Sequence, residues 1–236
     1  MANKPIAVIA GGYPSQRGSS VCFLDSGFHY GRLTIPSRLL AKEGYTIALV
    51  ARGADSLKAL ADEINAAGGT ATPFLYPPIT PRISIPLMPK SDVQAVTQTN
   101  IEGAFAFSKN VIQAFQANQV DEKGKRGSLI FTGATASVRG NVTTSAFSAG
   151  KHAVRALSKS LAKEFGKQNI HVSHAIIDGG ILTNASRERH NDPEWERNED
   201  VRLSPDGIAE SYLHLINQPR SAWTWELDLR PAHEKW

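Results

Sequence analysis

The sequence has very little cysteine and no long apolar run. Cys22 is the single cysteine among 236 residues. One thiol neither closes an internal disulfide nor builds a zinc site, which excludes disulfide-stabilised secreted scaffolds and zinc modules, and we expect no metal site. No window approaches the roughly 18 consecutive apolar residues of a membrane-spanning helix, and the first residues lack the pattern of a signal peptide. We therefore expect a cytoplasmic protein that does not enter a membrane.

The chain also lacks a strong excess of charge of one sign. Its 26 Lys and Arg residues oppose 22 Asp and Glu residues, which gives a formal net charge of +4. The basic residues are scattered among acidic ones rather than gathered in a stripe, so the pattern does not favour a nucleic-acid partner. An anionic small molecule suits this weak positive charge equally well.

Short apolar runs alternate with helical patterns along the chain. Each run is short enough for a strand buried on both faces, and each helical pattern repeats its apolar residues at intervals of three or four. This order implies parallel strands joined by right-handed crossovers. We therefore predict the α/β class, with one Rossmann-like domain over residues 1–236 and a doubly wound parallel sheet in three α/β/α layers. The predicted strands are 5–10, 46–51, 70–76, 127–132, 170–177 and 222–229, and the predicted helices are 37–45, 54–67, 91–117, 145–165 and 204–216.

Two segments interrupt this order. Residues 22–36 hold two glycines, a proline and no helical period at the place of the first crossover helix, so we interpret them as an insertion. Six prolines fall between Pro73 and Pro89, and each removes a backbone donor that a helix or a central strand needs. We therefore expect the Pro-rich segment 73–90 to replace a strand-helix unit, leaving a central unit missing or distorted around residues 75–90.

The first predicted strand ends in a glycine-rich run, Ala-Gly-Gly-Tyr-Pro-Ser-Gln-Arg-Gly-Ser-Ser, at residues 10–20. Glycines between a strand and a helix let backbone N–H groups approach a phosphate, although the pattern G-x-G-x-x-G is not met. Arg52 follows the second strand, where a guanidinium accommodates a ribose 2′-phosphate and an acid would bind a free 2′-hydroxyl. We therefore predict NADP in preference to NAD; the alternative is that Arg52 is a solvated loop residue. The predicted contacts at this end of the cofactor are Gly11, Ser15, Arg17, Gly18 and Arg52.

Four stretches carry the motifs of a known family in the right order. They are Thr-Asn-Ile-Glu-Gly at 99–103 and the segments 129–137, 146–154 and 171–183. On these residues the chain resembles the short-chain dehydrogenase/reductase family, and the resemblance covers residues 5–21, 37–74 and 91 to the C-terminus. It implies an oxidoreductase that transfers a hydride between a nicotinamide and the carbonyl or alcohol carbon of a small molecule. It also implies a homodimer or homotetramer.

The resemblance assigns roles to particular residues. Lys151 matches the lysine that lowers the pKa of the family's tyrosine and binds the ribose, and Asn100 matches the asparagine that holds a water for proton relay. Phe147 occupies the tyrosine position and Ala134 the serine position. Because neither side chain exchanges a proton or stabilises an oxyanion, we expect an impaired proton-transfer site.

Other residues near these positions are weaker candidates. Hydroxyl groups could replace the missing ones, but each is more typical of a local helix or turn hydrogen bond, and His152 and His174 are expected outside the reacting groups. The resemblance places the backbone of Ile181 and the hydroxyl of Thr183 at the nicotinamide carboxamide. They follow Asp-Gly-Gly at 178–180, which replaces the family's proline-glycine. Residues 75–90 contain no counterpart of the family's asparagine-alanine-glycine motif. The hydroxyls that could replace those missing at positions 147 and 134 belong to Thr132, Thr135, Ser137, Ser145 and Ser148.

Three functional hypotheses follow. The first is an NADP(H)-dependent oxidoreductase of the short-chain type that acts on an unidentified carbonyl or alcohol. The second is a catalytically idle cofactor-binding pseudoenzyme or dimer partner, which Phe147 and Ala134 favour. The third is a non-functional chain from misread coding boundaries, whose sheet would be incomplete.

Overall fold

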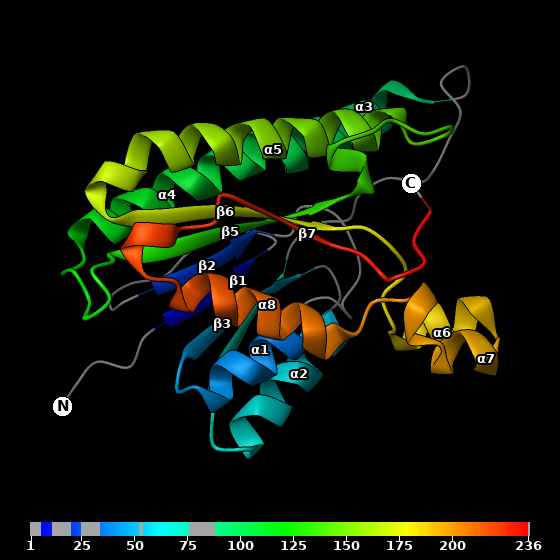
Figure 1. The fold of residues 1–236 in the computed structure, drawn as a ribbon, viewed down its shortest axis with the longest axis horizontal. Helices are drawn as coiled ribbons and strands as arrows, with labels where there is room; N and C mark the ends of the chain where they lie inside the picture. The colour runs from blue at the N-terminus through cyan, green and yellow to red at the C-terminus, as the bar shows by residue number, and fades with distance from the viewer. Residues whose placement is uncertain (1–5, 11–19, 25–33, 52–53, 76–87, 236) are drawn as a thin grey trace.

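A parallel sheet lies between two layers of helices in the computed structural model of the protein (Figure 1). The structure describes residues 6–10, 20–24, 34–51, 54–75 and 88–235. Within these residues the sheet has seven strands in the order β4-β3-β1-β2-β5-β6-β7, and every neighbouring pair is parallel. The predicted class, a Rossmann-like α/β fold, is confirmed. The strands are β1 (Ile6–Ala10), β2 (Ser20–Leu24), β3 (Thr46–Ala51), β4 (Thr70–Leu75), β5 (Gly127–Ala134), β6 (Ile170–Ile177) and β7 (Glu226–Leu229).

The helices cover both faces of the sheet, and a small lobe projects at one end (Figure 1). One face carries α3 (Lys90–Thr97), a π-helical segment (Gln98–Gly103), α4 (Ala104–Ala117) and α5 (Ser145–Phe165). The other carries α1 (Thr34–Lys42), α2 (Ala54–Ala66) and α8 (Pro205–Asn217), and the lobe holds α6 (Asn184–His190) and α7 (Pro193–Arg197). Short 3-10 turns cover Thr135–Ser137, Gly166–Gln168, Glu199–Val201 and Arg220–Ala222.

Local sequence signals explain most element boundaries. Gly44 follows α1 with φ +86°, a left-handed conformation that glycine adopts without a Cβ clash. Ser204 caps α8 by accepting a hydrogen bond from the backbone N–H of Gly207, with Pro205 at the first helical position. The predicted helix 91–117 is continuous but contains the π segment. Pro73 lies in β4, an edge strand, where a missing donor is tolerated.

One prediction about the sheet is wrong. We expected a central strand to be missing, but Ser20–Leu24 forms β2 between β1 and β5, in register Val8↔Cys22↔Leu129. The segment interpreted as an insertion, 22–36, therefore contributes part of β2 and the start of α1, and the sheet is not short of a strand. The reason is that the apolar run Ser-Val-Cys-Phe-Leu suits a strand buried on both faces. Residues 76–87 lie outside the described part of the chain.

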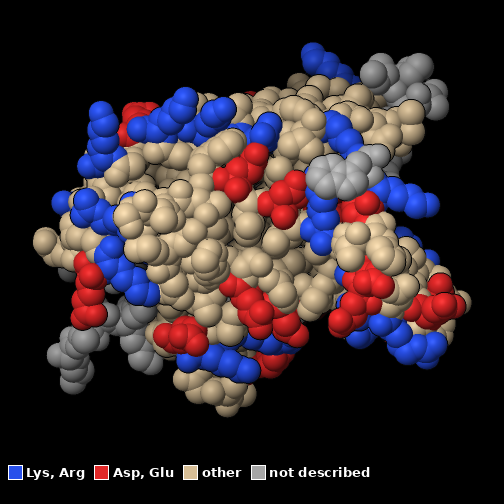
Figure 2. Space-filling view, viewed as in Figure 1, with Lys and Arg blue, Asp and Glu red and all other residues tan. Residues whose placement is uncertain are grey.

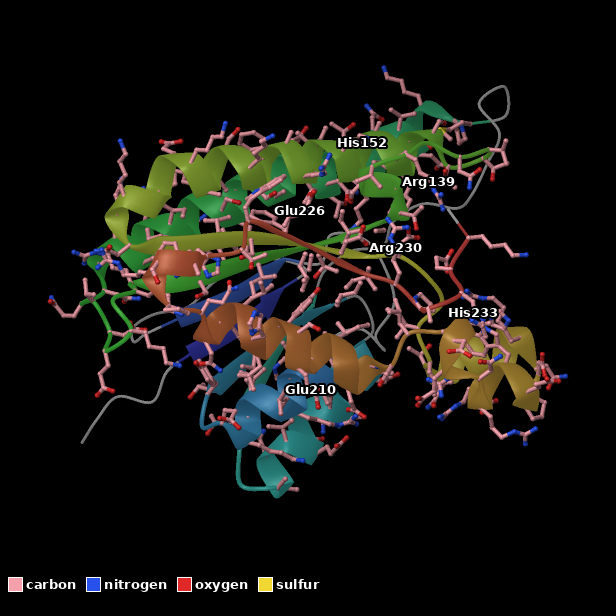
Figure 3. All side chains as sticks on the ribbon, in the orientation of Figure 1. Arg139, His152, Glu210, Glu226, Arg230 and His233 are labelled. Carbon is pink, nitrogen blue, oxygen red and sulfur yellow. The ribbon has the colours of Figure 1, made fainter. Side chains whose placement is uncertain are left out.

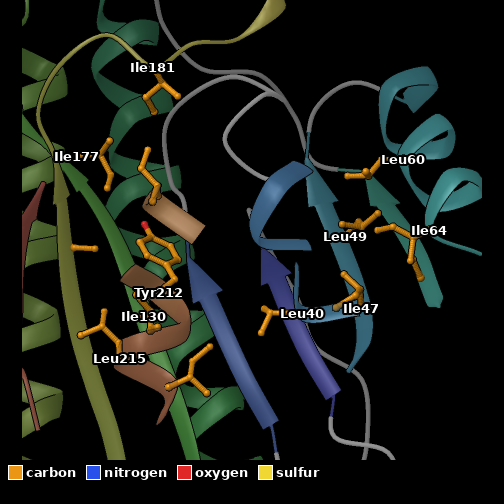
Figure 4. Close-up of a cluster of buried hydrophobic side chains, with 14 of the residues drawn as sticks. Leu40, Ile47, Leu49, Leu60, Ile64, Ile130, Ile177, Ile181, Tyr212 and Leu215 are labelled. Atoms are coloured by element: carbon orange, nitrogen blue, oxygen red, sulfur yellow. The ribbon is translucent and has the colours of Figure 1, made fainter. Parts of the chain in front are cut away.

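Two apolar cores lie on opposite faces of the sheet. The first packs residues of β3, β5 and β6 against α1, α2 and α8, and includes Leu49, Leu60, Ile130 and Leu215 (Figure 4). The second packs Leu129 and Phe131 of β5 against α4 and α5. Alternate residues of β5 thus face different cores, as the period of a strand requires. Both cores hold β5 and β6 rigidly, so the carboxyl ends of these strands are fixed positions.

The charged surface and the hydropathy of the helices add two observations. On the face shown in Figure 2, Lys and Arg lie among Asp and Glu, and the lobe of α6 and α7 carries both signs. Within the described ranges, no helix has the length and apolar composition needed to cross a membrane.

Candidate functional site

Lys151 is a buried charged residue near the carboxyl end of β5. It lies on α5, its residue is 1% exposed, and its Nζ donates a hydrogen bond to the carbonyl oxygen of Thr132 at 2.9 Å. The same nitrogen lies 5.8 Å from the centre of the Phe147 ring, one helical turn earlier. An ammonium group is buried only where polar partners offset its lost hydration. The lysine head is therefore fixed between β5 and the first turns of α5.

Asn100 lies within the π-helical segment between α3 and α4. Its side chain is buried and its Nδ2 donates to the carbonyl oxygen of Val96 at 3.3 Å. Gly150 of α5 packs against this segment so closely that a Cβ there would lie 2.9 Å from the Asn100 Cβ. Short π segments are frequent at functional sites. The fold thus brings Asn100 to the residue that precedes Lys151.

Phe147 and Ala134 occupy the two positions that carry hydroxyl groups in the resembling family. Both are half-buried. Ala134 ends β5 opposite Ile177 of β6, and its N–H donates to the Ser137 hydroxyl oxygen at 3.1 Å. No proton donor or acceptor belongs to either side chain.

The hydroxyls near these positions have hydrogen-bond partners within the protein. Thr132 pairs with the Tyr212 hydroxyl at 2.9 Å, on the α8 side of the sheet. Ser137 accepts from Ala134, and the Thr144 and Ser148 hydroxyls lie 3.3 Å apart. The Thr135 hydroxyl donates to the Asp178 carboxylate. The bonds of Ser137 and Ser148 lie within one turn or helix end, whereas Thr132 and Thr135 bond to residues 80 and 43 positions along the chain.

A buried histidine, His174, lies on β6, the strand next to β5. His174 on β6 is fully buried, and its Nδ1 donates to the Glu226 carboxylate at 3.1 Å. Arg155 holds the same carboxylate through two hydrogen bonds of 2.6 and 2.7 Å. Burial lowers the pKa of His174 to about 4, against the opposing effect of Glu226, while the Arg155 hydrogen bond lowers the pKa of Glu226. His174 is therefore neutral at pH 7, and its hydrogen bond to Glu226 joins β6 to β7. His152, by contrast, is exposed on α5.

Ile181 and Thr183 follow the turn at the end of β6. Ile181 pairs with Leu203 in an isolated parallel bridge and is buried. The Thr183 hydroxyl caps α6 by accepting from the backbone N–H of Ser186 at 3.2 Å. Its oxygen thus has a structural role in addition to any contact with a cofactor.

The sequence gives no partner for Asp178, and the structure gives it two. Its carboxylate is 1% exposed and accepts from the Thr135 hydroxyl and from Arg230 Nη1. Arg230 follows β7, and the sequence carries no local signal that joins it to a residue 52 positions earlier. Figure 3 shows Arg230 between Arg139 and His233, along the side of the molecule that leads to the lobe of α6 and α7.

The predicted contacts for the phosphate end of the cofactor lie outside the described residues. They are Gly11, Ser15, Arg17, Gly18 and Arg52. The described part of the chain therefore contains only the end of the candidate site that carries Asn100, Lys151, Ile181 and Thr183.

Comparison with known proteins finds similarity to one family. A family model described as short chain dehydrogenase matches residues 79–194, the segment that carries Asn100, Ala134, Phe147, Lys151 and Thr183. The matched segment is just under half of the chain. The solved structures described below share the Rossmann-like α/β fold.

Particular relatives have low sequence identity. Carbonyl reductase family member 4 of Xenopus laevis is 27% identical over 132 residues, 54% of this chain and 52% of the relative, so this alignment spans about half the relative's length. The protein of the same description from Xenopus tropicalis is 24% identical over 208 residues, 78% of this chain and 85% of the relative.

Solved structures share the fold over nearly the whole chain. A short-chain dehydrogenase from Rhodopseudomonas palustris has a TM-score of 0.67 at 24% identity and covers 96% of this chain and 98% of its own. An actinorhodin polyketide ketoreductase variant with NADPH has a TM-score of 0.71 at 21% identity and covers 98% of both chains.

Proposed function

We propose that this chain is a member of the short-chain dehydrogenase/reductase family that binds NADP(H) and interconverts a small carbonyl compound and its alcohol, with a weakened proton-transfer step. The observation that carries the proposal is Lys151, buried with its ammonium hydrogen-bonded to Thr132 and packed beside the Asn100 segment. Such a buried cation suits the hydroxyls of a ribose, which accept its hydrogen bonds. The match over residues 79–194 supports the same class.

The donor set fits the nicotinamide half of such a cofactor. Lys151 would bind the ribose hydroxyls, and the backbone of Ile181 with the hydroxyl of Thr183 would bind the carboxamide. The bound cofactor supplies the hydride. NADP rather than NAD is proposed from Arg52, and the solved ketoreductase with NADPH has the same fold.

The chain's own residues explain why the reaction would be slow. Phe147 holds an apolar ring beside the lysine, and Ala134 offers no hydroxyl to the oxygen of a substrate. The proton then comes from solvent rather than from a positioned phenol, which forgoes the roughly 10²- to 10⁴-fold contribution of general acid catalysis. Holding the substrate beside the hydride donor still lowers the barrier.

A titration tests the cofactor part. NADPH should quench tryptophan fluorescence and raise the melting temperature, and NADH should do so at higher concentrations. Lys151→Met should weaken NADPH binding about tenfold, the effect of one charge-assisted hydrogen bond. Lys163→Met is the matched control, because Lys163 is exposed on the same helix. If millimolar NADPH gives no shift with the wild-type chain, the proposed function is wrong.

A second function, an idle cofactor-binding protein that acts as a partner subunit, is favoured by the engaged hydroxyls. Thr132, Thr135, Ser137 and Ser148 all have hydrogen-bond partners within the protein. None is then ready to replace the missing phenol. Turnover with aldehydes and diketones separates the two: NADPH oxidation above the buffer rate supports the enzyme, and tight binding with no oxidation supports the idle protein.

We further propose a single domain, a cytoplasmic location and a homodimer or homotetramer.

A further inference from the structure

The turn that follows β6 is held by an ion pair from the C-terminal segment. Asp178 is 1% exposed, and its carboxylate accepts from both Thr135 and Arg230. Arg230 also binds Asp228 at 2.8 Å, and its side chain is 13% exposed. The backbone N–H of Asp178 donates to the carbonyl oxygen of Leu229 at 2.9 Å. Both the side chain and the backbone of Asp178 are thus tied to the end of β7.

Residues 230–235 continue from Arg230 across neighbouring segments. Gly179 has φ +139°, and a Cβ added there would lie 2.7 Å from Pro231 Cδ. The backbone N–H of His233 donates to the carbonyl oxygen of Asp200 at 2.7 Å, next to the lobe of α6 and α7. Figure 1 shows this C-terminal segment passing from the sheet toward that lobe. The segment therefore packs on the turn from outside.

The same turn sets where the next residues lie. Gly180 accepts a hydrogen bond from the N–H of Leu203 at 2.7 Å, and Leu182 donates to the Leu203 carbonyl at 3.1 Å. The backbone that carries Ile181 and Thr183 is therefore held at two points. One is Asp178, at the start of the turn, and the other is Leu203, which bonds to the backbone on either side of Ile181. Losing the first anchor frees the start of the turn and leaves the second in place.

We propose that Arg230 is a positioning residue for the nicotinamide end of the cofactor: by holding the Asp178 carboxylate, it fixes the turn that places Ile181 and Thr183. This inference rests on the proposed function. Removing one partner of a buried ion pair leaves an uncompensated charge, so the turn must move to hydrate the carboxylate. The residues predicted for the phosphate end of the cofactor belong to other segments of the sequence, so binding at that end should not sense this movement.

Two probes separate positioning from general damage. One is NADPH, and the other is adenosine 2′,5′-bisphosphate, which carries the 2′-phosphate end and no nicotinamide. In Arg230→Met, which keeps much of the aliphatic stem, NADPH should bind about tenfold more weakly, the effect of losing one charged hydrogen bond. The bisphosphate should bind as it does to the wild type. Arg38→Met is the control, since Arg38 forms an exposed ion pair with Glu63 on the α1–α2 face.

Two further variants keep the inference testable if Arg230→Met folds poorly. Arg230→Lys retains the charge and should recover most NADPH affinity, while Asp178→Asn should reproduce the selective loss. Equal losses for both probes would show a merely structural role and overturn the inference, as would unchanged NADPH affinity in Arg230→Met. If the wild type binds the bisphosphate and NADPH but the variant shows no selective loss, only this inference fails. If the wild type binds neither probe, the proposed function fails as well.

Discussion

The ammonium nitrogen of Lys151 lies 5.8 Å from the centre of the Phe147 ring, near enough for a cation–π attraction. The two residues are four apart on α5, so they share one face of the helix. A phenol at position 147 would lie in the field of this cation, which lowers a phenol pKa. The surroundings of a proton donor are thus present although the donor itself is absent.

Restoring the two hydroxyl groups should therefore raise turnover. We expect the double variant Phe147→Tyr with Ala134→Ser to oxidise NADPH with a reactive diketone at least about 10²-fold faster than the wild type, because it regains general acid catalysis. Adding Lys151→Met to the double variant should remove the gain. A double variant that binds NADPH but stays inert would count against the catalytic hypothesis.

Close packing of α5 on the π segment predicts a stability effect at Gly150. A Cβ there would lie 2.7 Å from Val96 Cγ1 and 2.9 Å from the Asn100 Cβ, so Gly150→Ala must displace buried atoms. Overpacking of this kind costs about 1–3 kcal/mol, more than the helix propensity that alanine adds. Urea unfolding should show the loss. Gly140→Ala, with no atom within 4 Å of its Cβ position, should unfold like the wild type.

His171 and His174, both buried, predict lower stability in acid. Burial lowers the pKa values of His171 and His174 to about 4 in the folded protein, from an ordinary value of 6.5. Between these values the unfolded chain binds more protons, so the free energy of unfolding falls as the pH falls from 6.5 toward 4. Each histidine should lower the free energy of unfolding by about 2 kcal/mol at pH 5, and should leave it unchanged above pH 7.

The measurement is urea unfolding at neutral pH and at pH 5. On acidification to pH 5, His174→Gln should lose about 2 kcal/mol less of its free energy of unfolding than the wild type loses. His171→Gln should behave in the same way. If the variants and the wild type lose the same stability, these histidines do not titrate as the structure requires.

The central position of β2 predicts strong protection of its backbone amides. Residues 20–24 pair with β1 on one side and β5 on the other, and central strands open only in the larger unfolding events. In hydrogen exchange, a peptide covering 20–24 should exchange as slowly as one covering 127–134. The exposed segment around Val142 should exchange fast. Fast exchange at 20–24 would mean that the sheet lacks this strand in solution.

Much of the fold was predictable because local periodicity reports burial. The bounds of β3, α5 and β6 agree with the predicted 46–51, 145–165 and 170–177. The π segment around Asn100 was not predictable, since its apolar spacing reads as an ordinary helix. The candidate site divides in the same way: Lys151, Phe147 and Asn100 follow from motifs, but the partners of Asp178 and Glu226 do not.

The elements, their α/β order and the lack of a phenol and a hydroxyl at positions 147 and 134 follow from the amino-acid sequence alone. Those properties are local, because they depend on side-chain types and their spacing. Only the tertiary structure decided that Ser20–Leu24 fills the centre of the sheet, that Arg230 reaches Asp178 and that His174 meets Glu226. Backbone hydrogen bonds form equally well with many strands, and ion pairs form between any opposite charges that packing brings together. Which partners meet is therefore settled by the packing of the whole chain.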